Sequence, residues 1–333
     1  MKVFITGGTG FLGSHLANTL TERGIESTFI GRNEKLGRAY ESKLAKFEKC
    51  DTNDEKRVQE LMKGHTHVIH SAAFTSPWGR PEDFKSANLD ATISLLKVAK
   101  ANNVERFLQI STPSVYATNY ARFSIRESEP LQKTFLNDYA LTKYQAELEV
   151  LKAEKEGLFT VRFRPQGIFG PGDQAVFPRI ISTAKRGFIP VVGDGSNMID
   201  ISYVANVVDG VLTALDTSNA IRGKVYNLSN DEPISNYGVI RDVLGRLGIP
   251  YKEKRLPFAV AYALGGAMEF ISRNFQNYRE PILTRYMAAT LALTRTLNIE
   301  EAKRDLNYKP KVSMAEGLDR FIHWWKAKES GNV

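Results

Sequence analysis

The segment Thr6-Gly7-Gly8-Thr9-Gly10-Phe11-Leu12-Gly13 is the most informative part of the chain, and it follows directly on the apolar run Lys2-Val3-Phe4-Ile5. That run has the length and the side chains of a buried strand. Residues 11–23 repeat apolar side chains at the period of an amphipathic helix. Three glycines lie between the two, where a tight turn favours residues without a Cβ atom. The sequence therefore predicts a strand, a glycine turn and a helix in direct succession.

This turn predicts a dinucleotide-binding site. A helix N-terminus offers free N–H groups and the positive end of a dipole, and glycines let the backbone approach a pyrophosphate. We expect Gly7, Gly10, Phe11, Leu12 and Gly13 to hold that group. The turn is not a P-loop, because no Gly-Lys-Ser/Thr follows it.

The ends of the next two strands bear on the choice of cofactor. An acid after the second strand would bind the adenosine ribose and favour NAD, but the segment 28–33 has none and places Arg32 there. A guanidinium suits a 2′-phosphate, so NADP(H) is favoured and NAD(H) stays open. The alternative for Arg32 is a solvated loop residue. Asp51 and Thr52 follow the third strand, where they would hold the adenine amino group or cap a helix over 54–63.

The rest of the chain extends this pattern. Strands are predicted over 2–6, 26–30, 46–50, 66–70, 106–110 and 159–163. Helices are predicted over 11–23, 54–63, 83–102, 137–156 and 175–186. Such alternation favours an α/β fold with a Rossmann-like, doubly wound parallel sheet covered on both faces.

The C-terminal part of the sequence is mainly helical. A helix over 204–216 and a strand over 224–228 come first, and the further helices are expected over 235–247, 257–273, 280–290, 299–306 and 313–327. We expect residues 1–165 with about 204–230 to form the dinucleotide-binding domain. Residues 166–203 and 231–333 would form a smaller, helix-rich substrate-binding region.

A second motif, Asp138-Tyr139-Ala-Leu-Thr-Lys143, lies on a predicted helix. Residues four apart share one face, so Tyr139 and Lys143 can serve one site. A tyrosine has a pKa of about 10 and is a poor base, but a nearby ammonium and a positive nicotinamide ring both favour the phenolate. The spacing is frequent on helices by chance, and it becomes specific beside the glycine turn.

These motifs resemble one family, the extended short-chain dehydrogenases/reductases. The resemblance rests on the glycine turn, Asp51, the segment His70-Ser-Ala-Ala73, Asn88, Ser111-Thr112 and Tyr139/Lys143, and it runs over essentially the whole chain. It implies that Tyr139 is the acid/base and that Lys143 also holds the nicotinamide ribose.

The resemblance assigns further roles. Thr112, which lies three residues before Val115, would polarise the substrate oxygen, with Ser111 as the weaker candidate. Ala72 and Ala73 would line the cofactor after the fourth strand, and Pro165 to Ile168 would pack near the nicotinamide carboxamide. The family also implies a homodimer through a four-helix contact.

Two branches of the family differ in their substrates. Nucleotide-sugar enzymes of the family typically have an Asn where this chain has Gly167 and an arginine where it has Ile199, and both differences count against a nucleotide-sugar substrate. The run Arg164-Pro-Gln-Gly-Ile-Phe-Gly-Pro-Gly-Asp173 instead resembles the 3β-hydroxysteroid dehydrogenase branch. That branch includes sterol-4-carboxylate dehydrogenases and reductases of long-chain 2-alkyl-3-keto acids.

The resemblance implies an NAD(P)-dependent oxidoreductase that interconverts a secondary alcohol and a ketone on a bulky hydrophobic substrate. The apolar segment 255–293 would line its cleft or form the core of the smaller domain. A nucleotide-sugar epimerase, dehydratase or reductase is the alternative. A non-catalytic NADP-binding regulatory protein is a second one, disfavoured because Thr112, Tyr139 and Lys143 are all present.

Composition limits the remaining classes. The 333 residues are 42% hydrophobic and 25% charged with a net charge of +8, and residues 241–333 carry 16 Lys or Arg against 10 Asp or Glu. This excess predicts an acidic lipid-like substrate, peripheral contact with a membrane, or a solvated basic face. The sequence has no basic stripe with interleaved aromatic residues, so no nucleic-acid partner is expected.

The single Cys50 and the strand at the N-terminus favour a cytoplasmic location. His65, His67 and His70 cluster without a nearby acidic or thiol ligand, so no metal is expected.

Overall fold

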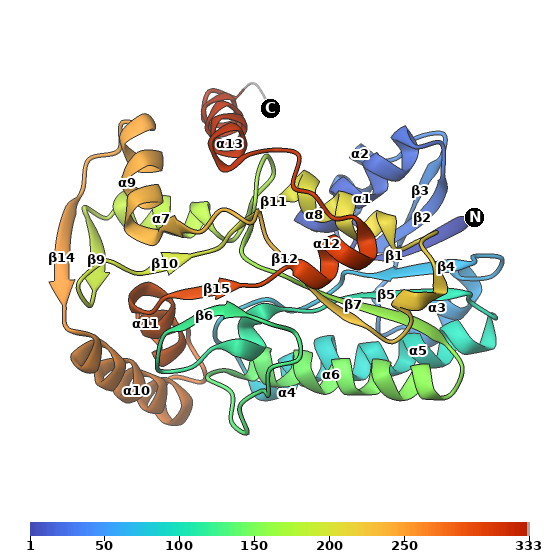
Figure 1. The fold of residues 1–333 in the computed structure, drawn as a ribbon, viewed down its shortest axis with the longest axis horizontal. Helices are drawn as coiled ribbons and strands as arrows, with labels where there is room; N and C mark the ends of the chain where they lie inside the picture. The colour runs from blue at the N-terminus through green and yellow to red at the C-terminus, as the bar shows by residue number, and fades with distance from the viewer. Residues whose placement is uncertain (332–333) are drawn as a thin grey trace.

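The computed structural model describes residues 1–331 and contains a seven-stranded sheet in which every neighbouring pair is parallel (Figure 1). The strands are β1 (Lys2–Thr6), β2 (Glu26–Gly31), β3 (Ala45–Lys49), β4 (His67–His70), β5 (Arg106–Ile110), β7 (Phe159–Pro165) and β12 (Val225–Leu228). Their order is β12-β7-β5-β4-β1-β2-β3. The Rossmann-like, doubly wound sheet is confirmed, and the order reverses between β1 and β4, where such folds bind ligands.

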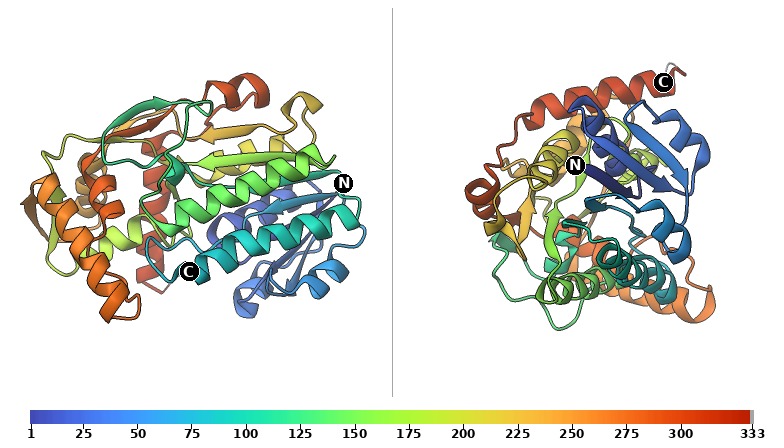
Figure 2. Two further views of the ribbon diagram at one scale, coloured as in Figure 1. Left: turned by 90° about the horizontal axis from the view of Figure 1, so that it is seen from below. Right: turned by 90° about the vertical axis from the view of Figure 1, so that its right-hand side faces the viewer.

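Helices cover both faces of this sheet (Figures 1 and 2). They are α1 (Phe11–Glu22), α2 (Glu34–Ala39), α3 (Glu55–Leu61), α4 (Pro81–Phe84), a π-helix (Lys85–Asp90), α5 (Ala91–Ala101), α6 (Asp138–Lys155) and α8 (Val204–Thr213). Strand β1 shows the alternation that separates the faces: Val3 and Ile5 belong to one buried cluster with Leu16 of α1, whereas Phe4 packs with Leu95 of α5. The N-terminal strand is therefore central and buried on both sides.

Two helical segments in this half differ in detail from what was predicted. The helix expected over 83–102 is present as one unbroken helical segment over residues 81–101, but its residues Lys85–Asp90 are π-helical, a wider turn that sequence periodicity does not reveal. Helix α2 was not expected; it is one short element, begun by the Asn33 side chain, which accepts a hydrogen bond from the Leu36 N–H at 3.1 Å.

The C-terminal part is helix-rich, as expected. Its helices are α7 (Phe177–Ala184), α9 (Asn236–Arg246), α10 (Phe258–Phe275), α11 (Arg285–Ala292), α12 (Glu300–Leu306) and α13 (Met314–Glu329). The helix expected over 280–290 begins later, because Thr284 forms the N-cap of α11 and accepts a hydrogen bond from the Met287 N–H at 3.1 Å.

Several short strands outside the seven-stranded sheet were not expected. They are β6 (Arg122–Ile125), β8 (Ile168–Phe169), β9 (Phe188–Val192), β10 (Met198–Ile199), β11 (Ser202–Tyr203), β13 (Ile234–Ser235), β14 (Lys252–Leu256) and β15 (Arg295–Leu297). Strand β14 is mostly charged and exposed, and β9 contains Pro190, so neither shows a strand pattern. They pair only with each other, and a two-stranded sheet leaves both edges free to accept a proline.

Within residues 1–331, none of the helices combines the length and hydropathy that a bilayer-spanning helix requires. The division into a dinucleotide-binding domain and a substrate-binding region stays a prediction.

Candidate active site

The glycine turn leaves space for a ligand at its middle position. Gly7 has φ of +70°, and a Cβ atom there would lie 2.7 Å from the Ala72 backbone. A Cβ atom on Gly13 would lie 2.2 Å from the carbonyl oxygen of Gly7. At Gly10, by contrast, a Cβ atom would meet only that carbonyl oxygen, at 3.1 Å. The outer glycines thus allow the chain to pack on itself, while Gly10 keeps its outer side open to a pyrophosphate.

No side chain caps the N-terminus of α1, so its free N–H groups are available to an anion. Gly10 is the N-cap residue and offers no side-chain cap, and the first turn holds no acidic residue. The Leu12 side chain is buried in the core, so Leu12 can contribute only its backbone N–H. The ring of Phe11 lies beside Gly172: a Cβ atom at Gly172 would be 3.4 Å from Phe11 Cδ2. These residues fit a dinucleotide phosphate group.

Arg32 and Asp51 lie together beyond the ends of β2 and β3. Arg32 has a side chain that is 85% exposed, and its Nη1 lies 4.0 Å from Asp51 Oδ2. The capping role considered for Asp51 is wrong, because Asp54 caps α3 by accepting from the Arg57 N–H at 3.1 Å. Asp51 accepts instead from the Asn53 N–H at 2.9 Å. Both side chains, and the half-buried Thr52, therefore border the same end of the sheet.

The catalytic candidates Tyr139 and Lys143 lie one turn apart on α6, whose N-cap is Asn137. Lys143 is 1% exposed, and its Nζ donates a hydrogen bond to the carbonyl oxygen of Ile110 at 2.6 Å. Burial lowers the pKa of Lys143 to about 8, while the charge of Glu147 acts in the opposite direction. Burial raises the pKa of Tyr139 to about 12, opposed by a hydrogen bond with Thr112. Burial thus outweighs this hydrogen bond, so the pKa of Tyr139 lies above its ordinary value and not below it.

A cluster of hydroxyl groups surrounds Tyr139. Thr112 shares a hydrogen bond with Tyr139, and its Oγ1 also donates to Ser114 Oγ at 3.0 Å. Ser114 Oγ in turn lies 2.8 Å from the hydroxyl of Tyr286 on α11. Ser114 and Tyr286 were not expected as site residues. Tyr286 lies in the apolar segment 255–293, for which a cleft or core position was predicted, and its hydroxyl group is the one local feature that could have indicated this contact.

Ser111, the weaker candidate, points elsewhere. Its hydroxyl donates to Glu147, which is buried and pairs with Arg164, with Nε 2.9 Å from Oε1. Burial opposes ionisation of Glu147, but the charge and hydrogen bonds of Arg164 outweigh it and keep the pKa of Glu147 below its ordinary value. The pair also contacts Tyr116. Ser111 therefore belongs to a buried network that supports β5, β7 and α6.

The segment after β4 is held against the glycine turn. The Ala72 N–H donates to Thr6 Oγ1 at 3.2 Å, and Ala73 follows it. Asn88, in the π-helix, accepts from the Phe74 N–H at 2.8 Å and donates to Thr142 on α6 at 3.1 Å. The π-helix thus lets one buried amide connect this segment with the catalytic helix.

Pro165 is the last residue of β7, and Ile168 begins β8, where it pairs with Ser202 of β11. Gly167 between them has φ of +30°, and a Cβ atom there would approach Ile201 to 3.1 Å. The chain turns sharply at this point at the carboxyl end of the sheet.

The three clustered histidines form hydrogen bonds with other residues of the protein. His70 lies between the hydroxyls of Thr6, at 2.7 Å, and Thr92, at 2.9 Å, and burial lowers its pKa to about 3. His65 contacts Thr28 and His67 contacts the carbonyl of Leu215. No group of three or more potential metal ligands was found in the part of the chain that the structure describes.

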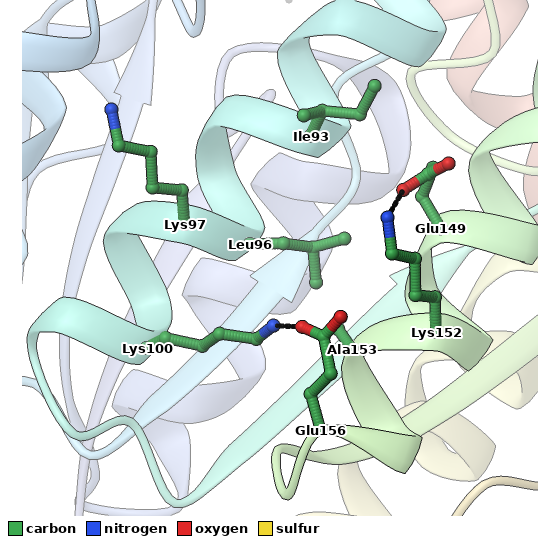
Figure 3. A pocket seen from close by; sticks show the side chains of 8 residues that line it. All are labelled: Ile93, Leu96, Lys97, Lys100, Glu149, Lys152, Ala153 and Glu156. Carbon is green, nitrogen blue, oxygen red and sulfur yellow. Dashed lines mark hydrogen bonds and ion pairs between the residues drawn. The ribbon is translucent and has the colours of Figure 1, made fainter.

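A surface hollow lies between α5 and α6, on the outer side of these helices (Figure 3). Aliphatic residues such as Leu96 line it, and an ion pair between Lys100 at the end of α5 and Glu156 at the end of α6 joins the two helices beside it. It holds none of the residues Thr112, Tyr139 or Lys143, so it is separate from the candidate active site.

A Rossmann-like sheet, an open glycine turn and a Tyr–Lys pair on one helix define the class of the extended short-chain dehydrogenases/reductases. Residues 3–229 match the NAD dependent epimerase/dehydratase family, and the chain belongs to it.

Curated relatives extend over nearly the whole chain. The chain is 34% identical over 327 residues to the 2-alkyl-3-oxoalkanoate reductase of Stenotrophomonas maltophilia, covering 96% of this chain and 98% of that protein. It is 32% identical over 345 residues to a sterol-4-alpha-carboxylate 3-dehydrogenase of Candida albicans, covering 97% of each. The structure of a UDP-glucuronic acid 4-epimerase from Bacillus cereus in complex with NAD aligns with a TM-score of 0.78 at 22% identity, covering 100% of this chain and 99% of that one. The epimerase similarity concerns the fold, whereas the relatives of higher identity are reductases and dehydrogenases.

Proposed function

We propose that this protein is an NADP(H)-preferring oxidoreductase that interconverts a secondary alcohol and a ketone on a bulky hydrophobic substrate. The observation that carries the proposal is the hydroxyl cluster of Thr112, Tyr139 and Tyr286 beside the buried Lys143. The names of the relatives support a long-chain 3-oxo acid or a sterol as the substrate class. Gly167 and Ile199, which replace polar residues typical of nucleotide-sugar enzymes, speak against the epimerase alternative.

The chain would hold the cofactor with residues at the ends of five strands, β1, β2, β3, β4 and β7, and with one residue of α6. Gly7, Gly10, Gly13 and the N–H groups of Phe11 and Leu12 would bind the pyrophosphate. The 2′-phosphate would bind Arg32, and the adenine would lie beside Asp51 and Thr52. Ala72, Ala73, Pro165 and Ile168 would border the nicotinamide half, with Lys143 on the ribose.

The proton chemistry follows from the states of the side chains. A nicotinamide cofactor held by these residues would supply or accept the hydride. At neutral pH the raised pKa keeps Tyr139 protonated, so in reduction it can donate its phenolic proton to the carbonyl oxygen. Thr112 would donate a hydrogen bond to the same oxygen once the substrate replaces one of its present partners. Lys143, still mostly an ammonium at pH 7, stabilises the phenolate that forms.

The remaining features of the proposal concern the organisation of the protein. Residues 1–165 with 204–230 would bind the cofactor, and residues 166–203 and 231–333 the substrate. Ile93 of α5 lines the hollow of Figure 3 and is exposed, and Leu148 of α6 is a second exposed apolar residue; both support a homodimer through these helices. We place the protein in the cytoplasm, with peripheral contact to a membrane.

A coupled screen tests the substrate class. NADPH or NADP⁺ consumption would be followed with a long-chain 2-alkyl-3-keto acid, a 3β-hydroxysterol and UDP-glucose. We expect turnover with one of the hydrophobic substrates and none with the nucleotide sugar. Faster turnover of UDP-glucose would contradict the proposal.

The cofactor preference has its own test. The substitution Arg32→Asp should shift the ratio of kcat/KM for NADP(H) over NAD(H) toward NAD(H) by at least about tenfold, since a charge-assisted bond is worth about 1.5–3 kcal/mol. Arg38→Asp, on the exposed side of α2, is the matched control. An unchanged ratio in Arg32→Asp would remove this residue from the 2′-phosphate site.

A further inference from the structure

Helix α10 exposes large apolar side chains along its whole length. The exposed residues are Val260, Leu264, Phe270, Ile271 and Phe275, and Ile282 follows in the next loop. Phe275 is 76% exposed and Ile282 is 81% exposed. The expectation that Leu264, Phe270 and Ile271 belong to the core of the smaller domain is wrong, because all three are exposed, and the alternative that they line a cleft stays a prediction. A surface helix normally directs such residues inward and charged ones outward, so α10 has the reverse pattern.

The orientation of α10 is fixed by the small residues on its inner face. A Cβ atom on Gly265 would lie 2.7 Å from the backbone of Thr284, so α10 and α11 pack closely there. Ser272 accepts a hydrogen bond from the Trp78 indole at 2.9 Å. Glu269 is buried and pairs with Arg285 at 2.7 Å. The apolar face therefore cannot turn inward without breaking these contacts.

Positive charge flanks the apolar face at both ends. Residues 252–285 contain six Lys or Arg and three Glu. Each of these glutamates is in an ion pair: Glu253 with Arg241, Glu269 with Arg285 and Glu280 with Arg179.

The cations near the two ends of α10 have fewer partners. Within the described residues, no ion pair is formed by Lys252, Lys254 and Arg255 before α10, by Arg273 in its last turn, or by Arg279 in the loop after it. Asp138 lies near Arg273 and offsets part of its charge. The excess of positive charge is therefore strongest before the helix begins and in the loop after it ends.

We propose that the outer face of α10, together with Ile282, is a docking surface for an anionic lipid bilayer. The helix would lie in the plane of the membrane, with Phe270, Phe275 and Ile282 at the boundary of the acyl chains and the flanking cations among the headgroups. Figures 1 and 2 show α10 at one edge of the molecule, away from the seven-stranded sheet, where a flat surface can reach it.

A second copy of the chain fits this face less well. A two-fold contact along α10 would bring the cations of one copy, among them Arg273 and Arg279, onto cations of the other. Anionic headgroups match the same charges.

Docking would also serve the proposed substrate, and this part of the inference rests on the proposed function. Helix α11 packs against α10 and carries Tyr286 to the catalytic hydroxyl groups. A lipid-like ketone could thus pass from the bilayer to Tyr139 along the α10–α11 side of the protein.

Co-sedimentation of the full-length protein tests the surface. The probes are vesicles of phosphatidylcholine alone and vesicles of phosphatidylcholine mixed with phosphatidylglycerol. The double variant Phe275→Ser/Ile282→Ser removes the outermost apolar groups, and Phe123→Ser, 69% exposed on β6, is the matched control. Lys252→Gln/Lys254→Gln/Arg255→Gln removes charge.

We expect binding to the mixed vesicles by the wild type and the control. The double variant should bind at least about tenfold more weakly, because each large side chain contributes by its burial in the apolar phase. The charge variant should lose most of its preference for mixed over neutral vesicles.

Three results would overturn the proposal: no binding of the wild type to mixed vesicles, equal binding by the double variant, or a change in oligomeric state of the double variant without lipid, which would assign the face to a second copy. NADPH-dependent reduction of a short, water-soluble 3-keto acid, measured in parallel, separates a failure of the proposed function from a failure of docking.

Discussion

Helices α6 and α10 are each 18 residues long, yet they use their faces in opposite ways. Helix α6 buries charged groups, Lys143 and Glu147, because partners on β5 and β7 receive them. Helix α10 buries three small residues and one paired carboxylate, Glu269, and leaves Phe270 and Phe275 exposed. The comparison shows that hydropathy alone does not identify the working face of a helix. What each side chain contacts decides it: on α6 the function lies inside, and on α10 we place it outside.

The largest effect is expected at the inner face of α6. Tyr139→Phe removes the proposed proton donor and should lower kcat by about 10²–10⁴-fold, the usual contribution of general acid–base catalysis. Binding of NADPH, measured by fluorescence titration, should remain. Tyr144→Phe alters a second tyrosine of the same helix, which packs against Phe135, and serves as the control. Activity retained in Tyr139→Phe would exclude this hydroxyl group from the reaction.

The buried pair on α6 should matter next, through stability. Glu147→Ala leaves Arg164 charged and without its partner, and we expect a loss of about 3–5 kcal/mol in the free energy of unfolding. Urea denaturation followed by circular dichroism measures it. Glu149→Ala, two residues away and near Lys152 at 3.9 Å, should change stability by less than about 1 kcal/mol. Similar losses in the two variants would mean that α6 is not organised around its inner face.

On α10, too, we expect a substitution on the inner face to lower the free energy of unfolding more than a substitution on the outer face. Gly265→Ala forces α10 and α11 apart, so we expect a loss of about 1–3 kcal/mol. Phe275→Ser, despite its larger chemical change, should alter the free energy of unfolding by no more than about 0.5 kcal/mol. The same urea denaturation compares them. A greater loss in Phe275→Ser would place this ring in a packed core.

The features of the fold and the site differ in how well the sequence predicts them, and the reason is physical. The glycine turn and the Tyr139/Lys143 pair are local patterns, and the parallel sheet follows from the alternation of strands and helices, so both could be predicted. The π-helix around Asn88 could not, because one wider turn leaves no periodic mark. Strand β14 is a charged edge stabilised by its partner β9. The outward face of α10 depends on where Gly265 meets the backbone of Thr284, a contact that hydropathy does not contain.

The contact between Ser114 and Tyr286 also lay beyond prediction, since it joins residues 172 positions apart. This contact connects α10 with α6: α11 packs on α10, and Tyr286 of α11 reaches the hydroxyl groups beside α6. If this link orients Thr112, its loss should have a small but specific effect on catalysis.

The smallest effect on catalysis is expected for Tyr286→Phe, which removes the hydrogen bond between Tyr286 and Ser114. Removing one neutral hydrogen bond should lower kcat/KM by about three- to tenfold, which corresponds to about 0.5–1.5 kcal/mol. If Tyr286 positions the hydroxyl cluster, kcat should fall and the pH profile should shift, since its hydroxyl lies near Tyr139 and bears on the pKa of that group. A purely structural role would instead lower the free energy of unfolding and leave the pH profile unchanged. Tyr262→Phe on α10, whose ring packs against Phe258, is the control. Equal kinetics in the two variants would disconnect the α10–α11 pair from the chemistry and leave α10 with the membrane role alone.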